Sequence, residues 1–467
     1  MKMKHVARQT WNLGFLDSVS LTRSQSATAA IFLLITFTFV TEFLHPPLGT
    51  LLMEIGFPIL AIGLLCRKTP DFFNPAFFFP PFYLLWCWIG SIPLIRNSGA
   101  IRLFDAFDDK QWLFYLTAFT AFWFGSLLIK FKNGNLSMLH GVTVPWREYD
   151  LFLFFGILAF VILLSWGVIT ASEGIPILHA DVETARDGLP SRHHMAYQAL
   201  IGTCDLMLPL IFLYLWTTRA PRLRGLLYCF SIFIVFALIS QGSRGLVLPA
   251  GLTVIVMRHY LVKRWSLRAL FIPTLAVVLL VSVSGYYRSI QHFGPGYALD
   301  LLDMGIPISL QPITNIYLYV RAPLDTFRQV VKLIPSMTPF QHGALSFGFV
   351  LQLLPGRHPS SDFFFKDLLG DVFAGFGEPA SILGPFYADF GMTGVILGMF
   401  LTGLMSKLIY IRMFRGSLGW LVAYCFLCQK LIASLYGSLF SYVIEILLPI
   451  AWILSVRVLT RGANPEP

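Results

Sequence analysis

The chain has 467 residues, of which 56% are hydrophobic and only 12% are charged. Soluble domains contain about 25% charged residues, so this composition excludes an ordinary soluble protein. The formal net charge is +10, but the basic residues lie in short connections between apolar segments. That placement is typical of membrane orientation and argues against a nucleic-acid partner.

Apolar segments long enough to cross a hydrocarbon core of about 30 Å recur along the whole chain. They are continuous rather than alternating, which favours helices over a β-barrel. We therefore predict an all-α polytopic membrane protein with about twelve transmembrane helices. The predicted spans are 27–44, 48–66, 75–94, 112–130, 150–170, 197–217, 225–240, 245–262, 268–284, 381–405, 418–438 and 441–458.

These spans divide the chain into three parts: spans one to nine within 1–284, a long loop at 285–380, and spans ten to twelve within 381–467. An even number of spans places both termini on one side of the membrane. Most of the 34 Lys and Arg residues fall in the connections on that side. The positive-inside rule therefore predicts that both termini are cytoplasmic.

The predicted loop at 285–380 lies on the outer side and is rich in Phe, Leu, Ile and Tyr. Residues 313–335 predict two short amphipathic helices that meet at Pro323, and residues 360–373 predict another. We expect these helices to lie at the outer interface and to cap the bundle. Loops carried on a rigid scaffold usually hold functional residues, so we expect the functional site on this face.

Arg244 lies in the short sequence SQGSRG between two apolar runs. Gly242 and Gly245 give this turn backbone freedom, and the next span begins directly after it. An arginine beside the free N–H groups of a helix N-terminus is a suitable anion site. The alternative is a plain connector whose arginine reaches the lipid headgroups.

Three further arginines are predicted near the same membrane level. Arg288 follows the ninth span, Arg321 lies in the first amphipathic segment of the loop, and Arg192 precedes the sixth span. A guanidinium binds phosphate oxygens in a bidentate manner, so two or three converging arginines indicate a diphosphate site. For each arginine alone, a headgroup contact or an ion pair is the alternative.

Three residues are candidates for a general base toward a hydroxyl group. Glu378 and Asp389 lie near the start of the tenth span, and His194 lies just before the sixth. For the carboxylates, an ion pair with one of the arginines is the alternative.

Several signals of other functions are absent from the sequence. It contains no DxD, HExxH, GxSxG or Walker motif and no acidic cluster typical of a divalent metal site. The six cysteines lie in or at the ends of apolar runs, where we expect buried thiols rather than disulfides. Few charges inside the spans and no clear internal repeat argue against an ion-coupled transporter.

Three stretches together carry a resemblance. The GSRG turn, the loop sequence YLYVRAPLDTF and the segment GEPASILGPFYADFGMTGVILGMFLTGL resemble the bacterial oligosaccharide repeat-unit polymerases, which are the O-antigen polymerases. The general layout is similar over nearly the whole chain, and the specific similarity covers 240–330 and 375–405.

The resemblance implies a GT-C glycosyltransferase of the bacterial inner membrane with its active site facing the periplasm. Such enzymes transfer a growing chain from undecaprenyl diphosphate to a new lipid-linked repeat unit, without a metal or other cofactor. Carried over by position, Arg244 and Arg288 hold the donor diphosphate, with Arg321 and Arg192 as second candidates. The resemblance also implies a chain-length regulator protein as a partner.

The chemistry of the residues agrees with this implication. Departure of a diphosphate builds negative charge, which preorganised arginines stabilise, and the acceptor hydroxyl needs a base or good alignment. Aromatic side chains stack on sugar rings or, alternatively, anchor the interface; the candidates are Tyr287, Tyr317 and Tyr387. Three alternative functions stay open: an O-antigen ligase that transfers glycan to the lipid A core, a flippase or other transporter for lipid-linked oligosaccharides, and a structural scaffold of an envelope assembly complex without catalysis.

Overall fold

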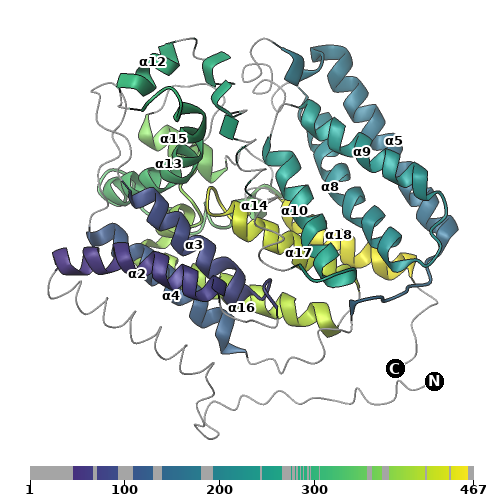
Figure 1. Ribbon diagram of the computed structural model, residues 1–467, viewed down its shortest axis with the longest axis horizontal. Coiled ribbons are helices and arrows are strands. Elements are labelled where there is room, and N and C mark those ends of the chain that lie inside the picture. Colours follow the sequence, from purple (N-terminus) through teal and green to yellow (C-terminus); the bar gives the residue numbers. More distant parts are fainter. Residues whose placement is uncertain are drawn as a thin grey trace, which may run out of the picture.

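The structure is a computed structural model that describes most of the chain (Figure 1). The described residues are 46–66, 71–92, 109–129, 139–179, 193–241, 244–265, separate residues between 275 and 303, and then 306–354, 360–370, 378–415, 418–440 and 443–460. Throughout these residues the regular secondary structure is helical, without a strand. The prediction of an all-α fold is confirmed.

Ten of the predicted spans coincide with helices in the described part of the chain. These helices are α2 (Pro46–Cys66), α3 (Pro75–Ser91), α4 (Asp109–Leu128), α5 (Glu148–Glu173), α8 (His194–Thr217), α9 (Arg224–Ser240), α10 (Arg244–Leu261), α16 (Leu383–Arg415), α17 (Leu418–Ala433) and α18 (Ile444–Leu459). The predicted span at 27–44 lies outside the described residues, and so does most of the span at 268–284.

Within the described residues, three helices are long and apolar enough to cross a membrane: Glu148–Leu178, Met195–Thr217 and Leu383–Phe414. Three shorter apolar helices accompany them, at Leu52–Leu65, Arg224–Ser240 and Leu418–Ala433. These lengths and compositions indicate a membrane protein. The number of about twelve spans stays a prediction.

The helices form two groups joined in the middle. In Figure 1, α2, α3, α4 and α16 lie together at the lower left, and α5, α8 and α9 lie at the right. Between them, α17 packs against α10, α16 and α18. Most of α17 is buried, and it contributes side chains to both large hydrophobic clusters. Helix α17 is therefore the element that connects the two groups.

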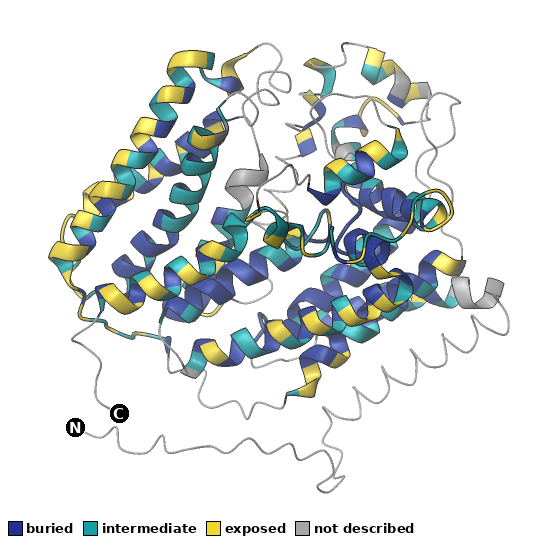
Figure 2. Cartoon of the chain, turned by 180° about the vertical axis from the view of Figure 1, so that it is seen from behind, coloured by how far each residue is buried: buried dark blue, intermediate teal, exposed yellow. Residues whose placement is uncertain are grey.

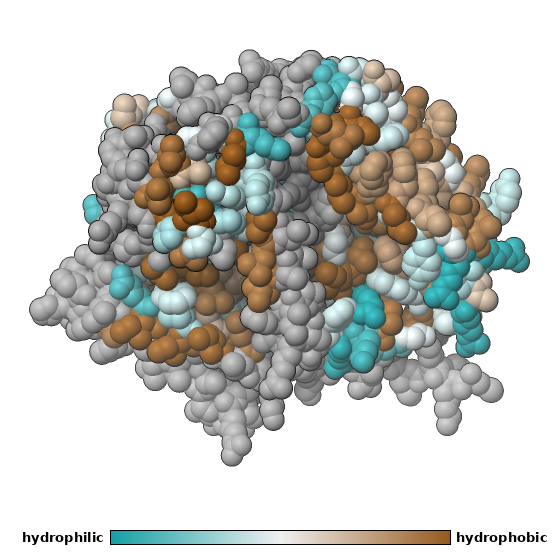
Figure 3. Space-filling view, turned by 45° about the horizontal axis from the view of Figure 1, so that its top comes forward, coloured by the Kyte–Doolittle hydropathy of each residue, from teal (hydrophilic) through white to brown (hydrophobic). Residues whose placement is uncertain are grey.

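The outward face of the second group is apolar. Figure 2 shows exposed residues along α5, and these include Leu153, Ile157, Phe160 and Leu164. Apolar side chains gather over this side of the molecule, at the right in Figure 3. An exposed apolar face of this extent is what a lipid-facing helix presents.

Helices α4 and α16 approach each other through glycines. A Cβ atom built on Gly403 would overlap the carbonyl oxygen of Phe122, and one built on Gly125 would overlap the carbonyl oxygen of Phe400. Small residues at such contacts let two backbones pack closely, which is a common way to join helices in membranes.

The start of α16 folds back on the rest of the helix. Gly391 has φ 64° and ψ −149°, a conformation that favours glycine, and the helix breaks there. As a result, Phe386 packs over Gly394 and Gly398, where a Cβ atom would collide with it.

The predicted outer loop is largely helical in its described part. It contains α12 (Gly296–Asp303), α13 (Gln311–Leu333), α14 (Gly348–Leu351) and α15 (Ser361–Leu369), which together are called the loop layer below. The helix predicted at 360–373 is confirmed as α15. The prediction of two helices meeting at Pro323 is wrong, because α13 runs through Pro323 without a break. Packing of the buried Leu324 and Phe327 outweighs the hydrogen bond that the proline removes.

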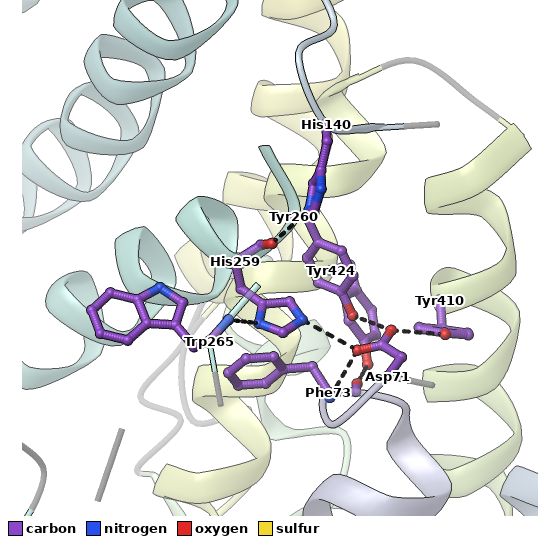
Figure 4. Close-up of polar contacts among 8 residues, drawn as sticks. All are labelled: Asp71, Phe73, His140, His259, Tyr260, Trp265, Tyr410 and Tyr424. Atoms are coloured by element: carbon purple, nitrogen blue, oxygen red, sulfur yellow. Dashed lines mark hydrogen bonds and ion pairs between the residues drawn. The ribbon is translucent and has the colours of Figure 1, made fainter. Parts of the chain in front are cut away.

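Opposite the loop layer, one buried carboxylate ties several helices together (Figure 4). Asp71, just before α3, accepts hydrogen bonds from the Tyr260 hydroxyl at 2.7 Å and the Tyr410 hydroxyl at 2.8 Å. His259 Nε2 lies 3.6 Å from the other carboxylate oxygen. Because His259 Nδ1 accepts the backbone N–H of Trp265, its proton lies on Nε2 and faces Asp71. Asp71 thus joins the ends of α3, α10 and α16.

The glycine contact yields a stability prediction. Gly403→Ala should destabilise the protein by about 1–3 kcal/mol, because the added methyl group meets backbone atoms of α4. Gly167→Ala is the matched control, since nothing lies within 4 Å of its Cβ position on α5. Thermal unfolding in detergent should show a lower midpoint for the first variant only. Equal midpoints would contradict the close approach of α4 and α16.

Candidate functional site

Arg321 lies at the centre of the contact between α13 and α3. Its side chain is fully buried. Its Nε lies 3.0 Å from one oxygen of Asp325, its Nη2 lies 3.1 Å from the other, and its Nη1 donates to the carbonyl of Gly90. The bidentate geometry that was expected for a phosphate is thus formed with an internal carboxylate.

Glu378 lies where the loop layer meets the segment before α16. Its carboxylate accepts a hydrogen bond from the Thr326 hydroxyl of α13 at 3.2 Å. Its backbone N–H donates to the carbonyl of Asp362 of α15 at 2.9 Å. Glu378 is therefore fixed against two helices of the loop layer.

Asp362 is a titratable group that sequence reasoning did not select. Burial raises the pKa of its carboxyl to about 6, and the negative charge of Glu445 acts in the same direction, while the hydroxyls of Ser361 and Ser438 oppose the shift. A carboxyl group that titrates near neutral pH is suited to general acid–base work. Together with Glu378, it gives the loop layer two neighbouring carboxyl groups.

Asp389 is fully buried and holds a turn of the loop layer. One carboxylate oxygen accepts the backbone N–H of Leu345 at 3.2 Å, and the other accepts the backbone N–H of Ser346 at 2.6 Å. Its own carbonyl accepts the backbone N–H of His342 at 3.3 Å. Through these contacts, Asp389 anchors the turn at 341–347.

The three candidate sugar-binding tyrosines differ in exposure. Tyr317 is buried and donates its hydroxyl to the carbonyl of Ile92 at 2.7 Å. Tyr387 is buried, donates to the carbonyl of Ile334 at 3.3 Å, and packs edge-on against Phe327. Tyr287 is 60% exposed. Of the three, Tyr287 is the one that presents an accessible ring.

The remaining predicted residues are placed by backbone alone or not at all. A helix begins at Arg244, as predicted, so the first N–H groups of α10 lack partners within the helix. His194 begins α8 in the same way. The side chains of these two residues lie outside the description, and Arg192 and Arg288 lie outside the described residues.

Three ionisable residues meet inside the apolar bundle, and sequence reasoning assigned none of them. Lys430 of α17 donates to Glu445 of α18, and both side chains are largely buried. Asp205 of α8 is close enough for its charge to interact with both. The signal was present in the sequence, because an ionisable residue inside an apolar run generally has a partner and a function.

These residues form a polar path toward the loop layer. The charge of Glu445 interacts with Asp205 on one side and with Asp362 on the other. Pro249 and Thr253 of α10 lie beside Asp205, five and nine residues after Arg244. At 1.5 Å per residue, the start of α10 is about 7–8 Å from Pro249. The path therefore ends near the helix N-terminus at which an anion site was predicted.

In the described part of the chain, no group of three or more His, Cys, Asp and Glu side chains could hold a metal ion.

Comparison with known families gives one match. The family model described as "Putative O-antigen polymerase" matches residues 71–445. The chain belongs to the O-antigen polymerase family. The match begins at the carboxylate that ties α3 to α10 and ends at the partner of Lys430, so it includes both polar clusters. No curated protein and no solved structure matches the chain.

Family membership confirms the resemblance drawn from the sequence. It supports a polymerase of surface polysaccharide in a membrane, with glycosyltransferase-type chemistry.

The ion pair of Arg321 allows a test that separates structure from substrate binding. Asp325→Leu should destabilise the protein by about 3–5 kcal/mol, because a buried guanidinium loses its carboxylate partner. The double variant Arg321→Met/Asp325→Leu should recover much of this loss, since no lone buried charge remains. Thermal unfolding in detergent measures the stability of the single and the double variant.

A double variant as unstable as the single variant would contradict the pairing. Polymer formed by the folded double variant would show that Arg321 acts in packing rather than on the substrate.

Proposed function

We propose that this protein polymerises lipid-linked oligosaccharide repeat units at the periplasmic face of the bacterial inner membrane. The growing chain leaves undecaprenyl diphosphate and is transferred to a hydroxyl group of a new lipid-linked unit. The observation that carries the proposal is the family match over residues 71–445. The lipid bilayer and a chain-length regulator protein are the other proposed partners, and no cofactor is proposed.

The donor diphosphate binds at the start of α10. A helix begins at Arg244, and its free N–H groups, together with a guanidinium, form a suitable anion site. Arg288 and Arg192 are proposed to complete the site. Arg321 is the weakest of the four candidates, because its guanidinium is already held by Asp325 and Gly90.

The acceptor hydroxyl is deprotonated in the loop layer. The proposed bases are Glu378, Asp389 and His194. Glu378 has the best support, because both carboxylate oxygens of Asp389 already accept hydrogen bonds from backbone N–H groups. The neighbouring Asp362 is a further candidate, since its pKa of about 6 lets it exchange a proton near neutral pH. The exposed ring of Tyr287 is the proposed sugar-stacking surface, whereas Tyr317 and Tyr387 are buried and have less support as sugar contacts.

The reaction needs two things from the protein: stabilisation of the negative charge on the leaving diphosphate, and alignment of donor and acceptor. As the bond to the diphosphate breaks, negative charge grows on its oxygens, and fixed N–H donors and arginines stabilise that charge. Holding donor and acceptor at one interface supplies the alignment. Family membership favours this reaction over the ligase and flippase alternatives.

The proposal predicts how variants at Arg244 behave in a host whose own copy of the gene is deleted. Arg244→Ala should reduce the surface glycan from a ladder to a single repeat unit on the lipid core. Arg244→Lys should lose at least about tenfold of the long chains, because an ammonium cannot bind phosphate in a bidentate manner. Gel analysis of extracted glycan measures the chain length, and immunoblotting measures the amount of protein.

Arg219→Ala is the matched control. Arg219 is exposed just after the C-terminal end of α8, so its replacement should leave the ladder intact. Long chains made by Arg244→Ala at the wild-type protein level would contradict the diphosphate assignment. In the deletion host itself, full-length chains accumulating on the carrier would indicate a ligase, and single units trapped on the cytoplasmic face would indicate a flippase.

A further inference from the structure

A polar pocket lies inside the helix bundle, where α8, α10, α17 and α18 meet. The space in it that a water-sized sphere can occupy is about 10 Å³, which is room for one water molecule or one small ion. Asp205 and Pro209 of α8, Thr253 of α10 and Gln429 of α17 line it, together with apolar side chains. Asp205 lies about 16 Å along α8 from its first residue, at 1.5 Å per residue. The pocket is thus well inside the apolar bundle.

The pocket presents oxygen atoms whose hydrogen-bonding capacity is unused. Gln429 is 3% exposed, and its side-chain oxygen has no hydrogen-bond partner among the described residues. Within the same part of the chain, no hydrogen bond or ion pair reaches the carboxylate of Asp205. A buried acceptor without a partner is costly, so the oxygen of Gln429 needs a donor or a cation, and the partly buried carboxylate of Asp205 lines the same pocket.

The backbone adds a further acceptor. Pro209 is four residues after Asp205 and has no N–H, so the carbonyl of Asp205 lacks its normal helical partner. Two side-chain donors in the lining are already used: the Thr253 hydroxyl donates to the carbonyl of Pro249 at 3.1 Å, and Trp452 Nε1 donates to the carbonyl of Leu206 at 3.1 Å.

Among the described residues, the cluster in its ionised form carries one more negative than positive charge. Lys430 and Glu445 neutralise each other in their ion pair, and an ionised Asp205 adds the further negative charge. A net charge inside an apolar bundle is expensive unless a counter-charge accompanies it. One positive charge balances this cluster, whereas a divalent ion would leave an excess of one.

We infer that this pocket binds a monovalent metal cation through the Asp205 carboxylate, the side-chain oxygen of Gln429 and the backbone carbonyl freed by Pro209. Neutral carbonyl and amide oxygens with one carboxylate are hard ligands, which suit Na⁺ or K⁺. Backbone carbonyls released at a helix irregularity coordinate Na⁺ in other membrane proteins. The cation links α8 to α17, the helix that connects the two halves of the bundle.

The test uses the purified full-length chain in detergent, with Na⁺ itself as the probe. Thermal unfolding is followed in NaCl and in choline chloride at equal ionic strength, and then with KCl. We expect the midpoint to rise with NaCl or KCl and to saturate, because a ligand that binds only the folded state stabilises it by mass action. Choline is too large for the pocket and should give no rise.

Two variants locate the effect. Asp205→Asn and Gln429→Leu should each abolish the cation-dependent rise. Asp150→Asn is the control, since Asp150 is an exposed carboxylate at the start of α5 and should keep the full rise. If Asp205→Asn does not fold, the uncharged exchange Gln429→Leu and direct binding of radioactive sodium to the wild type decide the question.

Equal midpoints of the wild type in NaCl, KCl and choline chloride would overturn the inference. So would a full rise in either pocket variant. A midpoint that ignores salt but falls as the pH rises, in the wild type and not in Asp205→Asn, would show that a proton occupies the carboxylate instead. Because the readout is stability and not polymer, the result is independent of the proposed glycosyl transfer.

Discussion

A charge inside an apolar bundle must be paired, and this constraint determines where the helices of this protein meet. Asp71 accepts the hydroxyl of Tyr410, which is 339 positions away in the chain. Arg321 joins α13 to the end of α3, and Lys430 joins α17 to α18. Hydrophobic burial alone is non-directional, so it does not select one arrangement among several similar helices. The directional contacts of these few charged residues select the arrangement that is observed.

The two ends of α3 show what the constraint achieves. One end is held by the Asp71 cluster, and the other is held by Arg321 and Tyr317 of the loop layer. The loop layer is therefore fixed to the bundle rather than tethered to it. For a polymerase, this matters because donor and acceptor must be held at one interface while the chain grows.

Sequence reasoning located the helices well, because apolar periodicity and glycine or proline boundaries are local properties. The start of α10 at Arg244 and the helix α15 are examples. It failed at Pro323, where burial of neighbouring residues keeps α13 continuous. For Arg321, the ion pair that was left open as the alternative to a phosphate contact is the one that forms, with Asp325 four residues later on the same helix.

The meeting of Asp205, Lys430 and Glu445 was beyond sequence reasoning. These residues come from three helices, and no local pattern shows which helices are neighbours. The same limit applies to Asp389, whose role depends on backbone N–H groups of a turn more than forty residues earlier. Residue type indicates that a buried charge needs a partner, and only the packing shows which partner it has.

The most direct test of the account is polymerisation by the purified protein in vesicles that contain undecaprenyl-diphosphate-linked repeat units and nothing else. The account predicts a ladder of longer chains on the lipid carrier, formed without a nucleotide sugar or an added divalent metal. A correctly folded protein that leaves every unit single, or that elongates only when a nucleotide sugar is supplied, would contradict it.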